Sequence, residues 1–264
     1  MMDEPEPLPA IVQVVGVAYT YRPSLAVRHY LTEKAVGQHS SKNQTFSYFY
    51  KGDRRSIPGN NEELYLRNDP ATGQMARHWP EPELAVLLGP QHRILAYTLA
   101  NDLTAISIEA RGRTTQLDGT YEGKVWLRSG SLGPAFLPAS ALDDAYKLDI
   151  GLRIERNGKT LYDQSYNTAR SLRPFQDIPD EIVKCFRTYR DELPASKRIL
   201  LDQDGFLATG TVVMLGAGLI VSDRYALQPG DEIIVSCSPI GELRNVLTLQ
   251  EDQPRALPQS FRSP

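Results

Sequence analysis

Short stretches in which apolar and polar residues alternate dominate the chain from Glu81 to Leu249. In a strand, a period of two places alternate side chains on the same face, so this pattern predicts a sheet-rich protein. The expected strands are ELAVLL (83–88), RILAYTLAND (93–102), KVWLR (124–128), YKLDIGLRIERNGKTLYDQSYN (146–167) and DEIIVSCSPIGELRNVLTL (231–249). Two earlier runs, 10–19 and 44–52, add further strands.

Turn and helix signals interrupt the strands at a few places. The sequence RNGK (156–159) predicts a tight hairpin, because Asn-Gly accepts the positive φ angles that match the twist of the flanking strands. Residues 177–194 have apolar side chains at helical spacing, with Asp177 or Asp180 as a possible N-cap. Residues 24–35 also have helical character.

The fold class expected from these patterns is α+β, mainly β, with a few short helices. We expect a flexible lead-in at 1–9, one catalytic domain at 10–250, and a flexible tail at 251–264, because the two ends are polar and rich in proline.

Two glutamates stand one residue apart at the head of an apolar strand, in WPEPELAVLL (79–88). Alternation places Glu81 and Glu83 on one face, about 7 Å apart. The short connection 89–93 predicts a hairpin, so that Asp102 at the end of the next strand returns to the glutamate end. Like charges so placed repel one another, and burial increases the cost.

A bound cation would remove that repulsion. Three oxygen ligands without Cys or His favour Mg²⁺, with Mn²⁺ or Ca²⁺ possible, over Zn²⁺. Three protein ligands leave positions for water and substrate. The alternative is that Glu81 and Glu83 are ordinary surface charges at the start of a strand.

The bulk composition excludes several classes of protein. The net charge of −3 provides no basic field for nucleic acid. Basic clusters such as KGDRR (51–55) are typical of solvated loops. No segment has the apolar length that a membrane span needs, and the acidic, Pro-rich start is unlike a signal peptide, so we expect a cytoplasmic protein. Two distant cysteines, Cys185 and Cys237, do not make a disulfide framework.

Several motifs taken together resemble the fumarylacetoacetate hydrolase superfamily. PEPELAVLL followed by ILAYTLANDLTA resembles its Glu-x-Glu strand and the strand that ends in a ligand Asp. ATGTVVMLGAG, and LQPGDEIIVSCSPIGELRNVL after it, resemble its C-terminal Thr-Gly-Thr, Gly-Asp and Ile-Gly-x-Leu stretch. VVGVAYTYRPS and FSYFYKG resemble its opening segments, so that the likeness covers about 10–247. Within the superfamily, the 2-keto-3-deoxy sugar-acid dehydratases of the arabinonate and xylonate type are the most similar.

The resemblance implies a mixed β-sandwich or roll, a homodimer, and specific site residues. It assigns Glu81, Glu83 and Asp102 as metal ligands, normally for Mg²⁺. Lys124 matches a lysine that faces the substrate. Thr211, with the adjacent Gly210 in TGT, matches a position that binds the substrate carboxylate.

The resemblance also implies a small 2-oxo acid as substrate. Such an acid can chelate the metal, which stabilises the enolate formed when a proton leaves C3. The possible reactions differ in the group that leaves: hydroxide in dehydration, CO₂ in decarboxylation, and a carbon fragment in C–C hydrolysis. Lys124 would stabilise charge or transfer a proton.

The chain departs from the family pattern where the hydrolases carry a His-Glu pair. Arg22 and Leu25 occupy those positions, which weighs against ordinary hydrolysis. His29 and Glu33, four residues apart, are either a substitute or a solvated helical pair.

A second departure follows the ligand Asp. Thr104-Ala105-Ile106-Ser107 replaces Ser-Ala-Arg-Asp, and Glu109 remains as a further catalytic candidate. The next loop differs from that of the dehydratases, which predicts a different substrate or a changed reaction. Arg111 and Arg113 are candidates for binding an acidic group of the substrate, with exposed loop arginines as the alternative.

Three hypotheses follow. The first is an Mg²⁺-dependent lyase that dehydrates a 2-keto-3-deoxy sugar-acid-like substrate. The second is a C–C hydrolase or decarboxylase of an acylpyruvate-type substrate. The third is a non-catalytic binding member of the fold.

Overall fold

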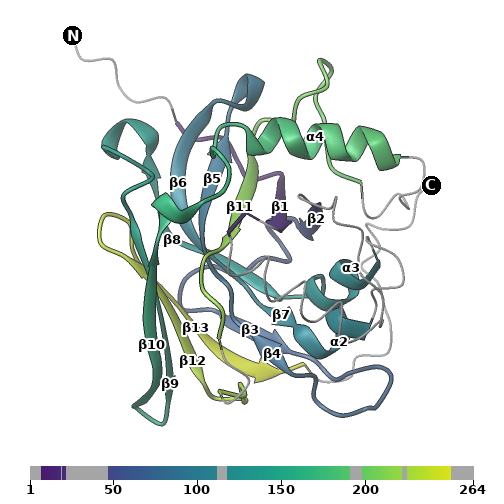
Figure 1. Cartoon of the computed structure of the whole chain (residues 1–264), viewed down its shortest axis with the longest axis vertical. Coiled ribbons are helices and arrows are strands. Elements are labelled where there is room, and N and C mark those ends of the chain that lie inside the picture. The colour runs from purple at the N-terminus through teal and green to yellow at the C-terminus, as the bar shows by residue number, and fades with distance from the viewer. Residues whose placement is uncertain are drawn as a thin grey trace.

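Two facing β-sheets form the body of the protein in the computed structural model (Figure 1). The structure describes residues 7–18, 20–21, 47–111, 118–190, 198–221 and 225–250. The first sheet has the order β2-β1-β11-β5-β6-β8 and is mixed, because β1 runs parallel to β11. Its strands are β1 (Gln13–Ala18), β2 (Ser47–Gly52), β5 (Pro82–Leu88), β6 (Ile94–Asp102), β8 (Gly130–Pro138) and β11 (Thr211–Ala217).

The second sheet has the order β10-β9-β12-β13-β3, with β13 and β3 parallel. Its strands are β3 (Glu63–Leu66), β9 (Asp149–Arg156), β10 (Lys159–Asn167), β12 (Glu232–Cys237) and β13 (Gly241–Leu249). A separate pair joins β4 (His78–Trp79) to β7 (Thr104–Ala105). These sheets confirm the predicted α+β, mainly β, class.

The helices are short, as predicted. They are α2 (Ile106–Arg111), α3 (Asp118–Lys124), α4 (Ile178–Tyr189) and the 3₁₀ turns η1 (Pro90–His92), η2 (Ala139–Ala141) and η3 (Thr168–Arg170). Helix α4 lies across the ends of β1, β2 and β11, whereas α2 and α3 lie together beside β7 (Figure 1). Asp177 stands at the N-cap of α4 but makes no side-chain capping bond.

The two faces of β5 enter different apolar clusters. Leu84, Val86 and Leu88 belong to the main core, which also contains side chains of the second sheet and of α4. Ala85 and Leu87 belong to a smaller cluster on the opposite face of the first sheet. Strand alternation therefore places Glu83 on the face away from the main core.

Two predicted hairpins are confirmed. Strands β5 and β6 pair in antiparallel register through η1. Strands β9 and β10 are joined by Asn157 and Gly158, whose φ angles of 52° and 72° are those that the Asn-Gly signal predicts.

The predicted strand at 124–128 is wrong. Lys124 ends α3, and the next residues form a turn in which the Trp126 indole N–H donates to the Tyr65 carbonyl at 2.7 Å. Five alternating residues are too few to separate a strand from a helix end. The expected strands also leave out β3, β4, β7, β8 and β11. Glycine and proline in β8 concealed that edge strand.

Other predictions fall on residues outside the described ranges. These are the helix at 24–35, the tail at 251–264, and residues 1–6 of the lead-in. Cys237 is a buried free thiol at the end of β12.

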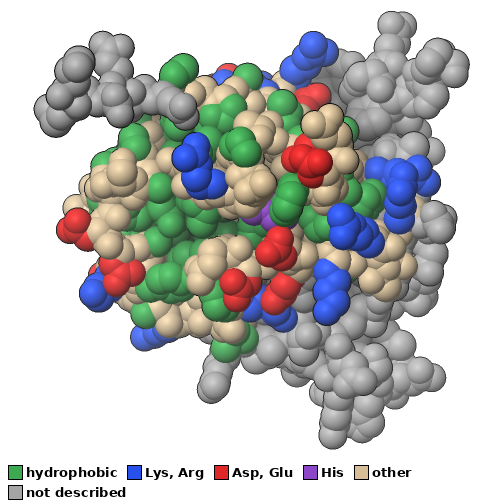
Figure 2. Space-filling view, turned by 90° about the horizontal axis from the view of Figure 1, so that it is seen from above, with side chains coloured by type: hydrophobic (Ala, Val, Ile, Leu, Met, Phe, Trp, Pro, Cys, Tyr) green, Lys and Arg blue, Asp and Glu red, His purple; other side chains and the backbone are tan. Residues whose placement is uncertain are grey.

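The outer surface mixes residue types. Figure 2 shows the molecule from above, where hydrophobic side chains gather between scattered charged groups. Within the described part of the chain, no helix has the length and apolar character needed to cross a bilayer.

Candidate metal centre

Three carboxylates converge where β5 begins and β6 ends. Pro82 pairs with Asn101 and Glu83 with Ala100, and the Asp102 N–H donates to the Glu81 carbonyl at 2.9 Å. One oxygen from each of Glu81, Glu83 and Asp102 lies within 4.8 Å of the others. Glu83 and Asp102 are buried, and Glu81 is partly open to solvent. The hairpin thus assembles the cluster that the sequence predicts.

Lys124, at the end of α3, reaches into this cluster. Its fully buried ammonium lies 2.8 Å from Glu81 Oε2, 2.6 Å from Asp102 Oδ2 and 2.7 Å from Thr104 Oγ1. The Thr104 hydroxyl also donates to Glu81 Oε1 at 3.1 Å. The Thr104 hydroxyl, in the segment 104–107 that departs from the family pattern, therefore links Lys124 to Glu81.

The surroundings shift the pKa values of Glu83 and Asp102 in opposite directions. Burial, with the charges of Asp102 and Glu81, raises the pKa of Glu83 well above its usual value. Burial also opposes ionisation of Asp102, but the ammonium groups of Lys124 and Lys51 outweigh it and lower the pKa of that carboxyl. A cation bound beside Glu83 would supply the positive charge that favours the ionised form of this carboxyl.

The backbone of β11 passes close to the Glu83 carboxylate at Gly216. A register shift in β11 between Met214 and Ala217 turns the Gly216 N–H toward Glu83 Oε2, at 2.6 Å. Gly216 has φ of 83°, and a Cβ atom there would lie 2.0 Å from Thr20 Oγ1. Only glycine fits this position.

Lys51 corrects the expectation that KGDRR is a solvated cluster. Its side chain is fully buried, and Nζ lies 2.5 Å from Asp102 Oδ1. Burial lowers the pKa of Lys51, and the Asp102 carboxylate partly offsets this. The signal was present in the sequence, because Lys51 continues the alternating strand 44–52 and precedes the turn.

The other predicted site residues fall in different places. Glu109 is buried in α2, where it closely approaches Gly123 of α3. Arg111 ends α2, but its side chain is not among those described. Arg113 lies outside the described residues, as do Arg22 and Leu25 at the family's His-Glu positions and the possible substitutes His29 and Glu33.

The structure places Thr211 and Gly210 away from the carboxylates. The Gly210 N–H donates to the Leu88 carbonyl, and Val212 pairs with Leu87, four residues and about 13 Å along β5 from Glu83. The Thr211 hydroxyl donates to the Ala208 carbonyl at 2.6 Å and accepts from Gln13 at 2.8 Å. Leu215-Gly216-Ala217, at the other end of β11, lies beside Glu83, and the assignment of Thr211 and Gly210 to the substrate carboxylate stays a prediction.

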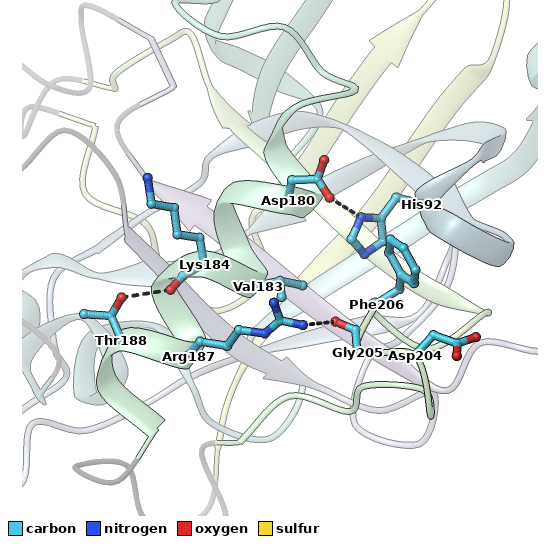
Figure 3. Close-up of a pocket in the computed structure, with 9 residues that line it drawn as sticks. All are labelled: His92, Asp180, Val183, Lys184, Arg187, Thr188, Asp204, Gly205 and Phe206. Carbon is cyan, nitrogen blue, oxygen red and sulfur yellow. Dashed lines mark hydrogen bonds and ion pairs between the residues drawn. The ribbon is translucent and has the colours of Figure 1, made fainter.

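Away from the carboxylate cluster, a hollow of about 600 Å³ lies between α4, η1 and the turn at 204–206 (Figure 3). His92 Nδ1 lies 2.8 Å from Asp180 Oδ1, and its Nε2 accepts the Leu207 N–H at 2.8 Å. The Arg187 guanidinium donates to the Gly205 carbonyl. These contacts join α4 to the turn, and no predicted site residue lines the hollow.

Comparison with known families gives one match that covers most of the chain. The family model described as fumarylacetoacetate (FAA) hydrolase C-terminal matches residues 13–248. Two relatives carry related names. A probable 2-keto-3-deoxyxylonate dehydratase of Haloferax volcanii is 27% identical over 235 residues, 84% of this chain and 70% of the relative. A 2-dehydro-3-deoxy-D-arabinonate dehydratase of Saccharolobus solfataricus is 24% identical over 197 residues, and the match spans 74% of this chain but only 56% of the relative.

Solved structures share the fold. A 2-keto-3-deoxy-D-arabinonate dehydratase complexed with magnesium and 2,5-dioxopentanoate has a TM-score of 0.69 at 21% identity, covering 91% of this chain and 74% of that one. A fumarylpyruvate hydrolase from Pseudomonas aeruginosa in complex with Mn²⁺ and pyruvate has a TM-score of 0.55 at 16% identity, covering 95% and 94%. The fold thus occurs in a dehydratase and in a hydrolase.

Proposed function

Because this chain belongs to the fumarylacetoacetate hydrolase family, we propose that it is an Mg²⁺-dependent enzyme that acts on a small 2-oxo acid. The reaction we propose is dehydration of a 2-keto-3-deoxy sugar-acid-like substrate, a lyase reaction. The observation that carries the proposal is the convergence of Glu81, Glu83 and Asp102 with the Lys124 ammonium. The names of the two relatives support dehydration.

The donor set fits a hard divalent cation. Glu81, Glu83 and Asp102 each offer a carboxylate oxygen, the ligand type that Mg²⁺, Mn²⁺ and Ca²⁺ prefer. A carboxylate as deeply buried as Glu83 ionises readily only beside positive charge. When bound, Mg²⁺ would act as a Lewis acid that stabilises negative charge developing on the substrate's keto oxygen.

The chain's own residues would manage position and protons. The three N–H groups of Lys124 point to Glu81, Asp102 and Thr104, and one of them would turn to the substrate's developing negative charge. The Thr104 hydroxyl would keep Lys124 aligned with Glu81. The Gly216 N–H would hold Glu83 in the orientation that faces the other two acids. Glu109, buried in the adjacent helix, is the candidate for proton transfer from C3.

The direct test is product analysis. Purified protein with Mg²⁺ is incubated with 2-keto-3-deoxy sugar acids, acylpyruvates and oxaloacetate, and the products are followed by mass spectrometry. We expect loss of one water from a sugar acid. Gain of water with two fragments would instead identify a C–C hydrolase, and loss of CO₂ a decarboxylase. No turnover of any compound, with metal bound, would favour a non-catalytic binding member of the fold.

We also propose that residues 10–250 form one catalytic domain that acts as a homodimer. One apolar core receives side chains from both sheets and from α4, which supports a single domain. Light scattering coupled to size-exclusion chromatography tests the assembly, and a monomeric mass would contradict it.

A further inference from the structure

Lys51 is a buried cation to which the reaction proposed above assigns no task. It lies on β2, and its side chain has no exposed surface. Its ammonium donates to Asp102 Oδ1 at 2.5 Å and also to the backbone carbonyl of Lys124. We propose that Lys51 is a positioning residue of the metal centre, which orients Asp102 and the end of α3 that carries Lys124. This inference rests on the proposed function.

The first contact fixes a metal ligand. The terminal torsion of an aspartate is broad and roughly two-fold, so a lone carboxylate rotates easily. Here Lys51 holds Oδ1 and Lys124 holds Oδ2, at 2.5 Å and 2.6 Å. Each carboxylate oxygen has two lone pairs, so one on each remains for a cation. With both oxygens held by donors on different elements, the carboxylate plane is set before a metal arrives.

The second contact fixes the helix end. The last carbonyls of a helix have no partner inside the helix and carry partial negative charge. The carbonyl of Lys124 accepts hydrogen bonds from the Lys51 ammonium and, at 3.0 Å, from the Ser129 hydroxyl. Lys51 therefore ties β2 to both β6 and α3, the elements that supply Asp102 and Lys124.

The surroundings of Lys51 are shaped for its stem and charge. Its Nζ lies 5.5 Å from the centre of the Trp126 ring, within cation–π range. Gly130 leaves room for the stem, because a Cβ atom at that position would lie 2.8 Å from Lys51 Cε. Lys51 is thus held by contacts on several sides, which suits a positioning role.

The direction in which metal affinity changes on removal of Lys51 distinguishes a positioning role from a purely electrostatic one. Lys51 repels a cation bound to Asp102, so removal of its charge alone would tighten metal binding. Removal of a positioning contact loosens binding, since residues that orient metal ligands typically change metal affinity by about 10- to 100-fold.

The test uses Mn²⁺ as the probe. Its dissociation constant and the electron paramagnetic resonance spectrum of the bound ion are measured for wild type, Lys51→Met and Lys147→Met. Lys147 is an exposed lysine and serves as the matched control. We expect Lys51→Met to weaken Mn²⁺ binding by about 10- to 100-fold and to alter the spectrum, with Lys147→Met unchanged.

A folded Lys51→Met protein with wild-type or tighter Mn²⁺ binding would overturn the inference. If that variant does not fold, Lys51→Arg replaces it. Its guanidinium keeps donors for Asp102, so affinity within about threefold of wild type supports positioning, and a larger loss overturns it. Failure of wild type to bind Mn²⁺ would overturn the metal-dependent function and this inference together. If wild type binds Mn²⁺ and Lys51→Met leaves the dissociation constant unchanged, this inference alone is overturned.

Discussion

The ammonium of Lys124 lies 2.6 Å from Oδ2 of Asp102, deep inside the protein and 22 residues away in sequence. One side chain is the candidate catalytic cation and the other a candidate metal ligand. In the metal-free protein the pair neutralises itself, because each member compensates for the burial of the other. The catalytic role proposed for Lys124 and the stability of the folded protein therefore depend on the same contact.

The first prediction concerns Lys124→Met. Breaking a buried ion pair by removing one partner typically costs about 3–5 kcal/mol, so the metal-free variant should have a lower thermal midpoint than wild type. Mg²⁺ supplies the lost positive charge and stabilises the folded state by binding to it. We therefore expect millimolar Mg²⁺ to raise the midpoint of the variant more than that of wild type, in differential scanning fluorimetry. Turnover should be lost at all Mg²⁺ concentrations. Equal midpoint shifts in both proteins would contradict the coupling.

The second prediction concerns Glu83→Gln. The amide oxygen can still accept the Gly216 N–H, so the fold is retained, but the charge that binds a cation is gone. Isothermal titration with Mn²⁺ should show affinity lower by about 100-fold or more, and activity should be lost. The metal-free variant should be no less stable than wild type, because a neutral amide replaces a carboxyl whose ionisation is disfavoured at this buried position. Glu242→Gln, at an exposed position on β13, is the control. Wild-type turnover by Glu83→Gln would refute the proposed mechanism.

The third prediction compares two threonines. Thr211→Val removes buried hydrogen bonds to Gln13 and Ala208, so it should cost about 1–3 kcal/mol of unfolding free energy in urea titrations. Mn²⁺ affinity should stay at the wild-type value, because Thr211 lies at the other end of β11 from Gly216. Thr104→Val removes the hydroxyl between Lys124 and Glu81 and should lower turnover. Lower metal affinity in folded Thr211→Val would place that residue at the centre after all.

The fourth prediction concerns stability and pH. Burial lowers the pKa of His78 from 6.5 to about 4, so the folded state keeps the imidazole neutral. Below pH 6.5 the unfolded chain takes up the proton first, so stability falls as the pH drops toward 4 and is fully present above 6.5. The total is about 3 kcal/mol.

His78→Gln tests this contribution. The glutamine carbonyl can accept the Arg67 N–H in place of the His78 ring nitrogen. Urea titrations at several pH values should give a shallower loss of stability on acidification for the variant than for wild type. Parallel curves for the two proteins would rule out His78 as the source.

The acidic cluster was predictable because its determinants are local. The spacing of Glu81 and Glu83 fixes their shared face, and a five-residue connection brings Asp102 back beside them. Strand period and hairpin closure depend on neighbouring residues, so alternation in the sequence is enough. The same reasoning predicted the Asn157–Gly158 turn and helix α4.

Long-range pairing decided the rest of the site. Lys51 contacts Asp102 although β2 and β6 are not neighbours in the sheet, and its sequence neighbours resemble a solvated loop. The Thr-Gly-Thr motif does not show which end of β11 meets Glu83, because that depends on the register of β11 against β5. Sequence alone thus determined that β5 pairs with β6 and that the three carboxylates of this hairpin meet. Only the tertiary structure determined which distant groups hold them, because those contacts depend on strand order and register, which local patterns do not encode.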